Sequence, residues 1–508
     1  MLVKINSYSI SGVSARRITI EVNVTNGAYF SIVGLPDNAV KESYQRVISA
    51  LKNSDYPIPV KGITINLAPA DIKKEGAGFD LPIAIGLLAA TGQISTSMLD
   101  ETFIVGELSL GGELRPVRGI LPMVMKAKSE GLSGAIIPHP NLGEACLIDG
   151  FSPLGFSCIR EITKYFIDPK SFSIVLPNKK ADKKQDFHGV DFGDVKGQQN
   201  IKRALEIAAA GGHNAMMVGP PGAGKSMLAK RIPSILPDLS HKDALETTSI
   251  YSVSRVNQYD GSLMNRRPFR SPHHTISDAA LVGGGTNPRP GEISLAHNGV
   301  LYLDELPEFK RSVLESLRQP LEDGVISISR SRETSVFPAN FMLIASMNPC
   351  PCGYYGQAEK SCVCVPGARS KYFNKISGPL LDRIDLHLEI NPVPIEDLVS
   401  FPRGENSETI KARIEKCWDF QRERAQKSRL KMKLNSKLNP ADMASICRLC
   451  ASGETILKKA VNSFKLSARS YDRVLKVSRT IADLTLSESI LPEHLAEAIQ
   501  YRSLEKKY

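Results

Sequence analysis

The sequence predicts an α/β protein with a P-loop core, a separate α/β domain before that core and a helical domain after it. The first observation is a glycine-rich loop between an apolar run at 215–218 and a helical pattern from residue 227. The second is another apolar run, 299–303, that ends in two carboxylates. The third is a change of pattern along the chain: short β-like segments alternate with helical ones up to residue 166, whereas the C-terminal region is helical.

Length and composition set the frame. The 508 residues suit about three domains. Lys and Arg outnumber Asp and Glu by 64 to 53, and the net charge of +11 would attract a polyanion but also suits a basic soluble enzyme. No run of about eighteen apolar residues occurs, and residues 1–6 alternate like a strand rather than a secretion signal. We therefore expect a cytoplasmic protein without a membrane partner.

Residues 1–167 form the first expected domain. Within it, 18–22 and 62–67 alternate as strands, and 38–52 has the spacing of an amphipathic helix. Residues 168–188 contain prolines and many charges but little apolar periodicity, so we interpret them as an interdomain linker. A contact between their basic residues and a polyanion is the rarer alternative.

The second expected domain, residues 189–395, contains the glycine-rich loop, which is its first candidate functional motif. Glycines allow backbone N–H groups to surround phosphate oxygens, a lysine can reach the β- and γ-phosphates, and a serine hydroxyl can bind Mg²⁺. The alternative is a glycine-rich turn with a chance Lys-Ser pair. All eight positions fit a nucleotide-binding loop: Gly219, Pro220, Pro221, Gly222, Ala223, Gly224, Lys225 and Ser226. The sequence thus predicts ATP and Mg²⁺ as cofactors.

The acidic pair after the second apolar run complements this loop. Asp304 would hold the Mg²⁺ shell opposite Ser226, and Glu305 would orient the water that attacks the γ-phosphate. Such a pair is a weak signal alone, because acids also gather at helix N-termini. Together with a complete phosphate loop it predicts an ATP hydrolase.

Four of the nine cysteines lie within fifteen residues, as two Cys-x-Cys pairs: Cys350, Cys352, Cys362 and Cys364. Four thiolates can bind Zn²⁺ tetrahedrally and hold a loop too small to have a core. The usual zinc spacing is Cys-x-x-Cys, so zinc and four reduced structural cysteines both remain open. A disulfide is disfavoured in the cytoplasm.

Residues 396–508 form the last expected domain. Its stretch 409–437 has a helical pattern in which basic residues far outnumber acids. A solvated helix face and a contact to a phosphate backbone are both open explanations. The basic residues are Lys411, Arg413, Lys416, Arg422, Arg424, Lys427, Arg429, Lys431 and Lys433.

Two stretches of the first domain, KKEGAGFDLPIA at 73–84 and GELSLGGELRPV at 106–117, resemble the catalytic domain of Lon proteases. The resemblance implies a Lon-protease-like α/β fold. In that family a nucleophilic serine stands in a glycine-rich turn, and the matching position here is Gly78, which has no side chain to activate. A non-proteolytic scaffold or a DNA-facing domain is therefore implied.

The core resembles AAA+ ATPases at two further places. The strand pattern 341–347 ends at Asn348, and the resemblance implies that this amide contacts the γ-phosphate or its water. The segment LLDRIDL at 380–386 resembles the one that carries an arginine finger, which implies that Arg383 completes a neighbouring subunit's site and that subunits form a ring. An ion pair of Arg383 with Asp382 or Asp385 is the alternative.

The same resemblance implies a second sensor residue in the C-terminal helices. Arg469 stands at the start of a helical pattern and is our candidate, with Arg473 one turn later as the fallback.

The segments RRPFRSPHHT at 266–275 and GGGTNPRPGEI at 283–293 predict a loop-rich insertion, and they resemble the magnesium-chelatase-like AAA+ ATPases of the YifB/ComM family. We expect the pair His273-His274 to serve structure or substrate contact rather than metal binding, because no third ligand lies nearby. The family resemblance covers nearly the whole chain. It implies a hexameric ring that acts on single-stranded or branched DNA, as a helicase in branch migration of incoming DNA during natural transformation. The alternatives are the motor subunit of a metal chelatase and a non-proteolytic remodelling ATPase.

Overall fold

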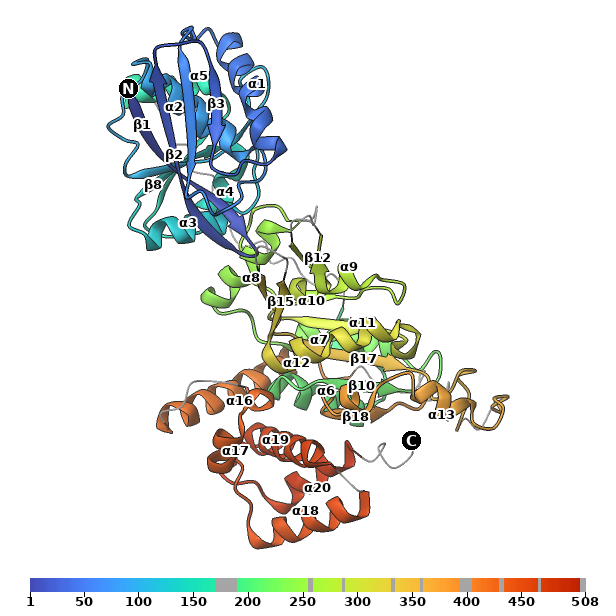
Figure 1. The fold of residues 1–508 in the computed structure, drawn as a ribbon. Helices are drawn as coiled ribbons and strands as arrows, with labels where there is room; N and C mark the ends of the chain where they lie inside the picture. Colours follow the sequence, from blue (N-terminus) through green and yellow to red (C-terminus); the bar gives the residue numbers. More distant parts are fainter. Residues whose placement is uncertain are drawn as a thin grey trace. The chain divides into compact units, whose positions relative to one another are not determined.

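The computed structural model describes residues 1–169, 190–254, 259–285, 288–329, 334–356, 360–392, 404–428, 434–464 and 467–502 (Figure 1). They divide into two compact units, Met1–Lys183 with Ala244–Met264 and Lys184–Asp243 with Asn265–Tyr508. Nearly all of the expected linker at 168–188 and the expected boundary at 395 lie outside the described residues. Among the residues described, no helix combines the length and the apolar character that crossing a membrane would require.

The first unit is built on a seven-stranded mixed sheet of order β3-β4-β2-β1-β5-β8-β9. β2 runs antiparallel to both of its neighbours, β1 and β4, whereas β3 is parallel to β4, and β5, β8 and β9 continue parallel to β1. The predicted strands at 18–22 and 62–67 are confirmed within β2 and β4. The strands are β1 (Leu2–Ser11), β2 (Ser14–Thr25), β3 (Phe30–Val33), β4 (Gly62–Ala68), β5 (Thr102–Ile104), β8 (Gly134–Pro138) and β9 (Ser152–Phe156).

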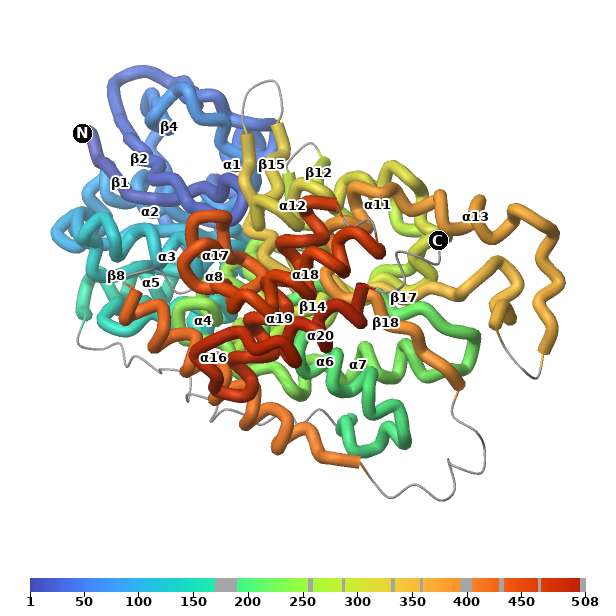
Figure 2. Tube along the Cα trace, turned by 90° about the horizontal axis from the view of Figure 1, so that it is seen from below, coloured from blue at the N-terminus to red at the C-terminus, as the bar shows by residue number. Residues whose placement is uncertain are grey.

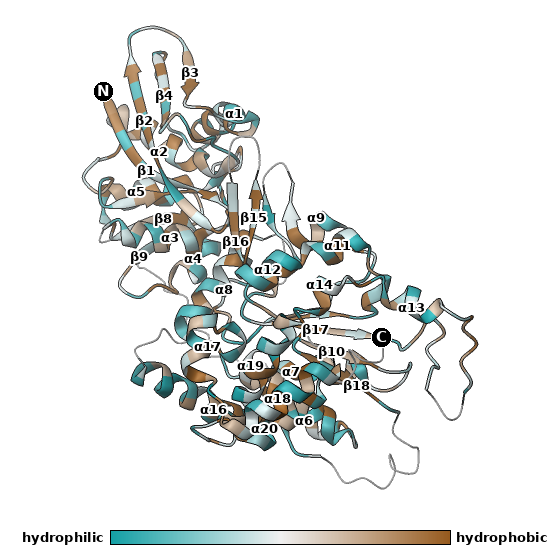
Figure 3. Cartoon of the chain, turned by 60° about the horizontal axis from the view of Figure 1, so that its bottom comes forward, coloured by the Kyte–Doolittle hydropathy of each residue, from teal (hydrophilic) through white to brown (hydrophobic). Residues whose placement is uncertain are grey.

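The helices of this unit are α1 (Asn38–Asn53), α2 (Asp80–Ala90), α3 (Ile120–Ser129), α4 (Leu142–Ala145) and α5 (Ile159–Ile167). The predicted helix at 38–52 is confirmed as α1. Every residue of α2 is buried, as its nearly all-apolar sequence requires. Gly86 lets α2 lie directly on β2, because a Cβ there would stand 2.6 Å from Val22 Cγ2. Figure 3 shows the apolar character of β4 in brown and the polar character of helices such as α16 in teal.

One segment lies outside the domain that its sequence position suggests. Residues 244–264 fall inside the expected core 189–395, yet they belong to the first compact unit. Helix α8 (His241–Val253) carries them there, and the Ser252 carbonyl accepts a 3.1 Å hydrogen bond from the Gly119 N–H at the start of α3. The Thr248 hydroxyl accepts one from the Met264 N–H at 3.0 Å, which closes the segment on itself.

The second unit contains a five-stranded sheet of order β11-β14-β17-β10-β18, and all its strand pairs are parallel. The apolar runs that sequence periodicity identified become three adjacent central strands, which confirms an α/β core with a parallel sheet. The strands are β10 (Ala215–Val218), β11 (Phe269–Arg270), β14 (Val300–Leu303), β17 (Met342–Met347) and β18 (Leu386–Glu389). Helices α6 (Gln199–Gly211) and α7 (Lys225–Ile235) pack against each other beside this sheet.

Short elements fill the connections of this sheet, and four of them, α9, β12, β13 and α10, lie in the loop-rich insertion expected between the two catalytic signatures. They are η4 (Phe192–Asp194), α9 (Asp278–Val282), β12 (Gly283–Gly284), β13 (Arg289–Pro290), α10 (Glu292–Leu295), η5 (Leu306–Glu308), α11 (Arg311–Ser316), α12 (Arg318–Asp323), β15 (Val325–Ser329), β16 (Thr334–Pro338), α13 (Ala368–Phe373) and α14 (Gly378–Leu381). β12 pairs with β13, and β15 with β16, as antiparallel hairpins.

The C-terminal region is helical, as expected, and Figure 2 shows its helices gathered in orange and red. α19 packs against α20, α16 and α6, so these helices belong to the same compact unit as the parallel sheet. The predicted helix over 409–437 is wrong in its length, because α16 ends at Lys427, and residues 435–437 form a separate 3₁₀ turn. The helices are α16 (Ser407–Lys427), η6 (Asn435–Lys437), α17 (Pro440–Ile446), α18 (Ala451–Phe464), α19 (Ala468–Leu484) and α20 (Pro492–Gln500).

Candidate active site

Three neighbouring parallel strands deliver the predicted site residues to one edge of the sheet. The glycine-rich loop follows β10, the pair Asp304 and Glu305 follows β14, and Asn348 follows β17. Because the carboxyl ends of parallel strands meet at the same edge, these residues converge, and Lys225 meets Asn348 although 123 positions separate the two in sequence.

The phosphate loop needs glycine where the backbone is tight. A Cβ at Gly219 would stand 2.4 Å from the Ile390 carbonyl oxygen, so only glycine lets the loop leave β10 at this point. Gly224 has φ of +86° and directly precedes α7, so the left-handed turn that starts the helix also favours glycine. Backbone N–H groups and the positive end of the α7 dipole then face the space that a phosphate would enter.

Lys225 lies folded onto its own loop. Its Nζ donates to the carbonyls of Gly219 at 2.5 Å and Pro220 at 2.8 Å, and to Asn348 Oδ1 at 3.1 Å. Burial lowers the pKa of Lys225, partly offset by the charges of Asp304 and Glu305. The predicted phosphate-binding lysine and the predicted sensor amide are thus in direct contact.

Asp304 is held by hydroxyl groups. Ser226 donates to its Oδ2 at 2.8 Å, and Ser346 donates to its Oδ1. The Tyr302 hydroxyl lies 3.1 Å from Ser226 Oγ and 2.9 Å from Ser346 Oγ, and it donates its single proton to one of the two. Burial alone would raise the pKa of Asp304, but these hydrogen bonds keep it below its usual value, so the carboxylate is ionised.

This arrangement fits Mg²⁺. The 2.8 Å between Ser226 Oγ and Asp304 Oδ2 is close to the edge of an octahedron with Mg–O bonds of 2.0–2.1 Å, which measures about 2.9 Å. A hydroxyl and a carboxylate are also the oxygen ligands that this ion prefers in nucleotide sites.

Glu305 has an unusual backbone and an accessible side chain. Its φ of +54° lies in the left-handed region, which non-glycine residues adopt at a cost, and such outliers gather at functional sites. The side chain is 53% exposed, and its Oε2 lies 3.4 Å from His274 Nδ1. His274 also stacks on His273, with ring centroids 4.1 Å apart. His274 therefore contacts the predicted catalytic acid.

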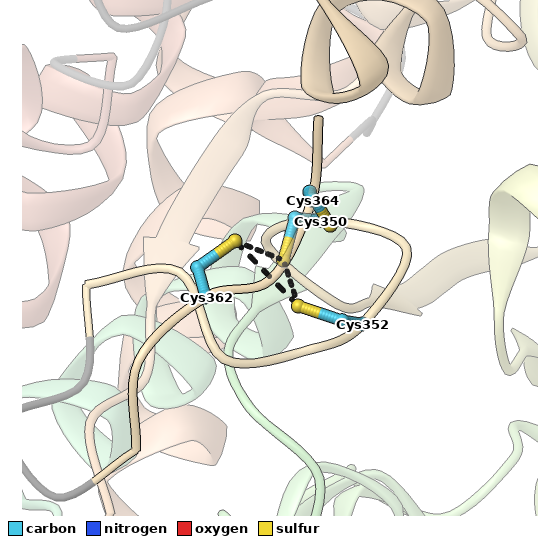
Figure 4. A group of neighbouring side chains, drawn as sticks. All are labelled: Cys350, Cys352, Cys362 and Cys364. Atoms are coloured by element: carbon cyan, nitrogen blue, oxygen red, sulfur yellow. Dashed lines mark hydrogen bonds between the residues drawn. The ribbon is translucent and has the colours of Figure 1, made fainter. Parts of the chain in front are cut away.

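The four cysteines lie together directly after Asn348 (Figure 4). Their sulfur atoms all lie within 4.8 Å of one another, and no other group of metal-ligating side chains of this kind occurs in the described part of the chain. Cys350 is buried and the other three are half-buried.

Arg383 lies buried inside its own chain. Its Nη1 donates to the Pro379 carbonyl at 2.6 Å and its Nη2 to Glu322, while its Nε has no hydrogen-bond partner. An intrachain ion pair therefore exists, but the expectation of Asp382 or Asp385 as partner is wrong, because α12 brings Glu322 to the guanidinium. The role of Arg383 at a neighbouring site stays a prediction.

The two candidate sensor arginines of α19 have different surroundings. Arg469 is 59% exposed, with Nη1 3.8 Å from Asp382 Oδ2. Arg473 is mostly buried and donates to Asp385 Oδ1 at 2.9 Å. Burial alone would raise the pKa of Asp385, but Arg473 and His213 hold it well below its usual range. Arg473 thus has a structural partner, and the sensor role of Arg469 stays a prediction.

The basic residues of α16 largely serve the fold. Ion pairs within the chain engage four of them: Lys411 with Asp238, Arg413 with Glu206 and Glu405, Arg422 with Asp419, and Arg424 with Asp483. These contacts favour a structural role over a phosphate-backbone contact for these four. The predicted basic residues at 429, 431 and 433 lie outside the described residues.

The first unit has no nucleophile at the position that matches the Lon serine. A Cβ at Gly78 would meet only Val105 Cγ2 at 3.3 Å and Val117 Cγ1 at 3.7 Å. The buried carboxylate two residues on, Asp80, forms a bidentate pair with Arg46 at 2.7 and 3.0 Å. The Lon-like fold and the absence of proteolytic activity stay predictions.

Sequence reasoning missed two residues of the site, Tyr302 and Ser346, and it did not place His274 beside Glu305. Tyr302 and Ser346 precede Asp304 and Asn348 by two positions, so strand alternation turns them to the same side as those residues. That period was a usable signal for both. The position of His274 depends on the path of the chain after β11, for which the sequence carries no comparable signal.

Comparison with known proteins identifies the family. Models of the magnesium chelatase subunit ChlI match residues 20–141 and 191–398, and a model of the C-terminal part of that subunit matches 404–502. The chain is 44% identical over 508 residues to the competence protein ComM of Haemophilus influenzae, covering 99% of this chain and 98% of that protein. It is 43% identical over 505 residues to YifB of Escherichia coli, with 99% and 97% covered. The chain therefore belongs to the magnesium-chelatase-like AAA+ ATPases of the YifB/ComM family.

Proposed function

We propose that this protein is an ATP-hydrolysing ring motor that acts on DNA, as a helicase that moves branched DNA during recombination of incoming strands. The observation that carries the ATPase part is the convergence of four residues at one sheet edge, where Lys225 donates to Asn348 and Ser226 donates to Asp304. Similarity over the full length to a protein named for competence supports the DNA part.

Each side chain has a distinct task in this proposal. Lys225 leaves the carbonyls of its loop and binds the β- and γ-phosphates, since its present partners are neutral oxygens that phosphate oxygens can replace. Ser226 and Asp304 hold Mg²⁺, which neutralises the charge of the phosphates. Glu305 orients the attacking water, and Asn348 contacts the γ-phosphate or this water.

The net charge of +11 is consistent with a polyanionic partner. Four basic side chains of α16 already form ion pairs with acidic residues of the same chain. We therefore expect other basic residues to contact the DNA. The second candidate function is the motor subunit of a metal chelatase, because the matching family models describe such a subunit. The two functions differ in their response to DNA.

The test is ATP turnover by the full chain with forked DNA, with linear duplex of the same length and without DNA, each at several salt concentrations. A DNA motor should turn over faster with DNA, most with the fork, and the effect should fall steeply with salt. A turnover rate that is the same with forked DNA, with linear duplex and without DNA would contradict the DNA assignment and favour the chelatase subunit.

Variants test the site itself. Lys225→Ala should abolish turnover, and Glu305→Gln should bind ATP without hydrolysing it, because the first loses the phosphate contact and the second the water-orienting carboxylate. Lys230→Ala and Glu308→Gln are matched controls, since both side chains are exposed and lie near the mutated ones. Near-normal turnover by Lys225→Ala or Glu305→Gln would disprove the ATPase site.

A further inference from the structure

The four-cysteine cluster has the dimensions of a tetrahedral thiolate site. The sulfur of Cys350 lies 3.3 Å from that of Cys352 and 3.7 Å from that of Cys362, and the last two are 3.5 Å apart. Zn–S bonds of 2.3 Å in a tetrahedron place sulfurs about 3.8 Å apart, whereas a disulfide bond is about 2.05 Å long. The spacing therefore suits one shared Zn²⁺ and no disulfide.

The backbone around the cluster also stabilises thiolates. The N–H groups of Tyr354 and Val363 donate to the Cys352 sulfur. Such N–H···S bonds orient a ligand and support its charged form.

The cluster sits on the nucleotide site. Cys350 is buried and lies two residues after Asn348, and the N–H of Gly353 donates to its carbonyl at 3.0 Å. Gly353 in turn rests on the phosphate loop: a Cβ there would stand 2.7 Å from Pro221 Cδ and 3.9 Å from Asn348 Cγ. The first Cys-x-Cys turn therefore contacts both halves of the site, the phosphate loop and the sensor amide.

We propose that a zinc ion bound by Cys350, Cys352, Cys362 and Cys364 holds residues 350–356 and 360–364 as a clamp, which seats Pro221 and Asn348 for ATP binding. The clamp rests on the proposed ATPase function. A segment of this size cannot bury a core of its own, so the metal would supply the constraint that fixes Gly353 against Pro221. Loss of zinc frees the clamp, and nucleotide binding weakens although every ATP-contacting side chain remains.

The first experiment measures metal in the purified full chain by elemental analysis, together with the affinity for a fluorescent ATP analogue. We expect about one zinc per chain. Cys352→Ser and Cys362→Ser should lose the zinc and bind the analogue at least about tenfold more weakly. Cys450→Ser is the matched control, because Cys450 is an exposed free thiol outside the cluster, and it should keep both properties.

A second variant separates the clamp from general misfolding. Gly353→Ala should keep its zinc, because no ligand changes, but weaken nucleotide binding, because the new Cβ presses on Pro221. Three results would each overturn this proposal. The first is wild-type protein without zinc, the second is a zinc-free cysteine variant with normal nucleotide affinity, and the third is a Gly353→Ala variant with normal nucleotide affinity. Lys225→Ala should lose turnover and retain zinc, because it changes the phosphate loop and no zinc ligand. If the wild-type protein itself binds zinc but hydrolyses no ATP, the proposed ATPase function is wrong and the proposed metal site is not.

Discussion

Arg383 provides a direct test of how subunits cooperate. Its side chain is buried within its own chain, whereas its predicted role requires it to reach the site of a neighbouring subunit. The side chain is 5% exposed and is held by Glu322 and the Pro379 carbonyl. A finger that acts in a neighbouring site must leave this position or be reached there by the neighbour's nucleotide. Two substitutions separate the alternatives: Arg383→Ala removes the guanidinium, and Glu322→Gln keeps it but removes its counter-charge.

Loss of an arginine finger should lower kcat, whereas loss of an ion pair should lower the free energy of unfolding. An arginine finger contributes about 10³–10⁵ in kcat, which corresponds to about 4–7 kcal/mol in the barrier. Removing one partner of a buried ion pair costs about 3–5 kcal/mol of stability. Because Glu322 is 49% exposed and therefore solvated, the stability loss should lie at or below the lower end of that range. Glu322→Gln leaves the nearly buried Arg383 guanidinium with a neutral partner, so we expect it to lower the free energy of unfolding by about 1–3 kcal/mol, with turnover within a few-fold of the parent protein.

The assay combines urea unfolding, sedimentation with ATP and steady-state turnover. If Arg383 acts in trans, Arg383→Ala should assemble and bind ATP yet lose at least about 10³ in kcat. Mixing it with Lys225→Ala subunits should then restore part of the activity, since some interfaces combine an intact loop with an intact arginine. Turnover by Arg383→Ala within a few-fold of normal would refute the finger. A mixture that stays inactive although its subunits exchange would mean either that Arg383 acts within its own chain or that all sites of the ring must be intact at once.

Two further predictions follow from the polar networks of the second unit. Ser346→Ala should raise the Mg²⁺ concentration for half-maximal turnover several-fold, because the Ser346 hydroxyl donates to Asp304; an unchanged Mg²⁺ titration would contradict this. Arg473→Met should lower the free energy of unfolding by about 3–5 kcal/mol at pH 7, because it leaves the Asp385 carboxylate buried without its guanidinium, whereas exposed Arg469→Met should change it by less than about 0.5 kcal/mol. Since the folded pKa of Asp385 is depressed, its stabilisation is present above the unfolded value near 3.9 and is lost as pH falls through the folded one. The Arg473→Met deficit should therefore shrink below about pH 4, and a constant deficit in acid unfolding would contradict the pairing.

Sequence patterns predicted the functional residues that lie in short contiguous motifs. The loop 219–226 and the strand ends at Asp304 and Asn348 could be predicted because an apolar strand and the polar residue that follows it are adjacent in the chain. Parallel pairing then brings these ends together without further information.

Features that depend on distant partners could not be predicted in the same way. Glu322 reaches Arg383 across 61 residues through a turn at the end of α12, and no local pattern marks that pair. Residues 244–264 were expected in the core because they lie between its two catalytic signatures in the sequence. Their packing against the first unit depends on contacts such as that of Ser252 with Gly119, which composition does not encode.

The segment that carries Arg383 also shows why activity alone is weak evidence for a finger. Asn214, directly before β10, accepts the Leu343 N–H at 2.9 Å, donates from its side chain to the Arg383 carbonyl at 3.0 Å and from its backbone to Asp385 at 2.8 Å. β10 has four residues, so about 13 Å of strand separates this junction from the phosphate loop. A substitution at Arg383 that shifts its backbone would therefore reach the nucleotide site of the same subunit through a rigid strand. Only restored activity in mixed rings separates a guanidinium that acts across the interface from a segment that acts within its own chain.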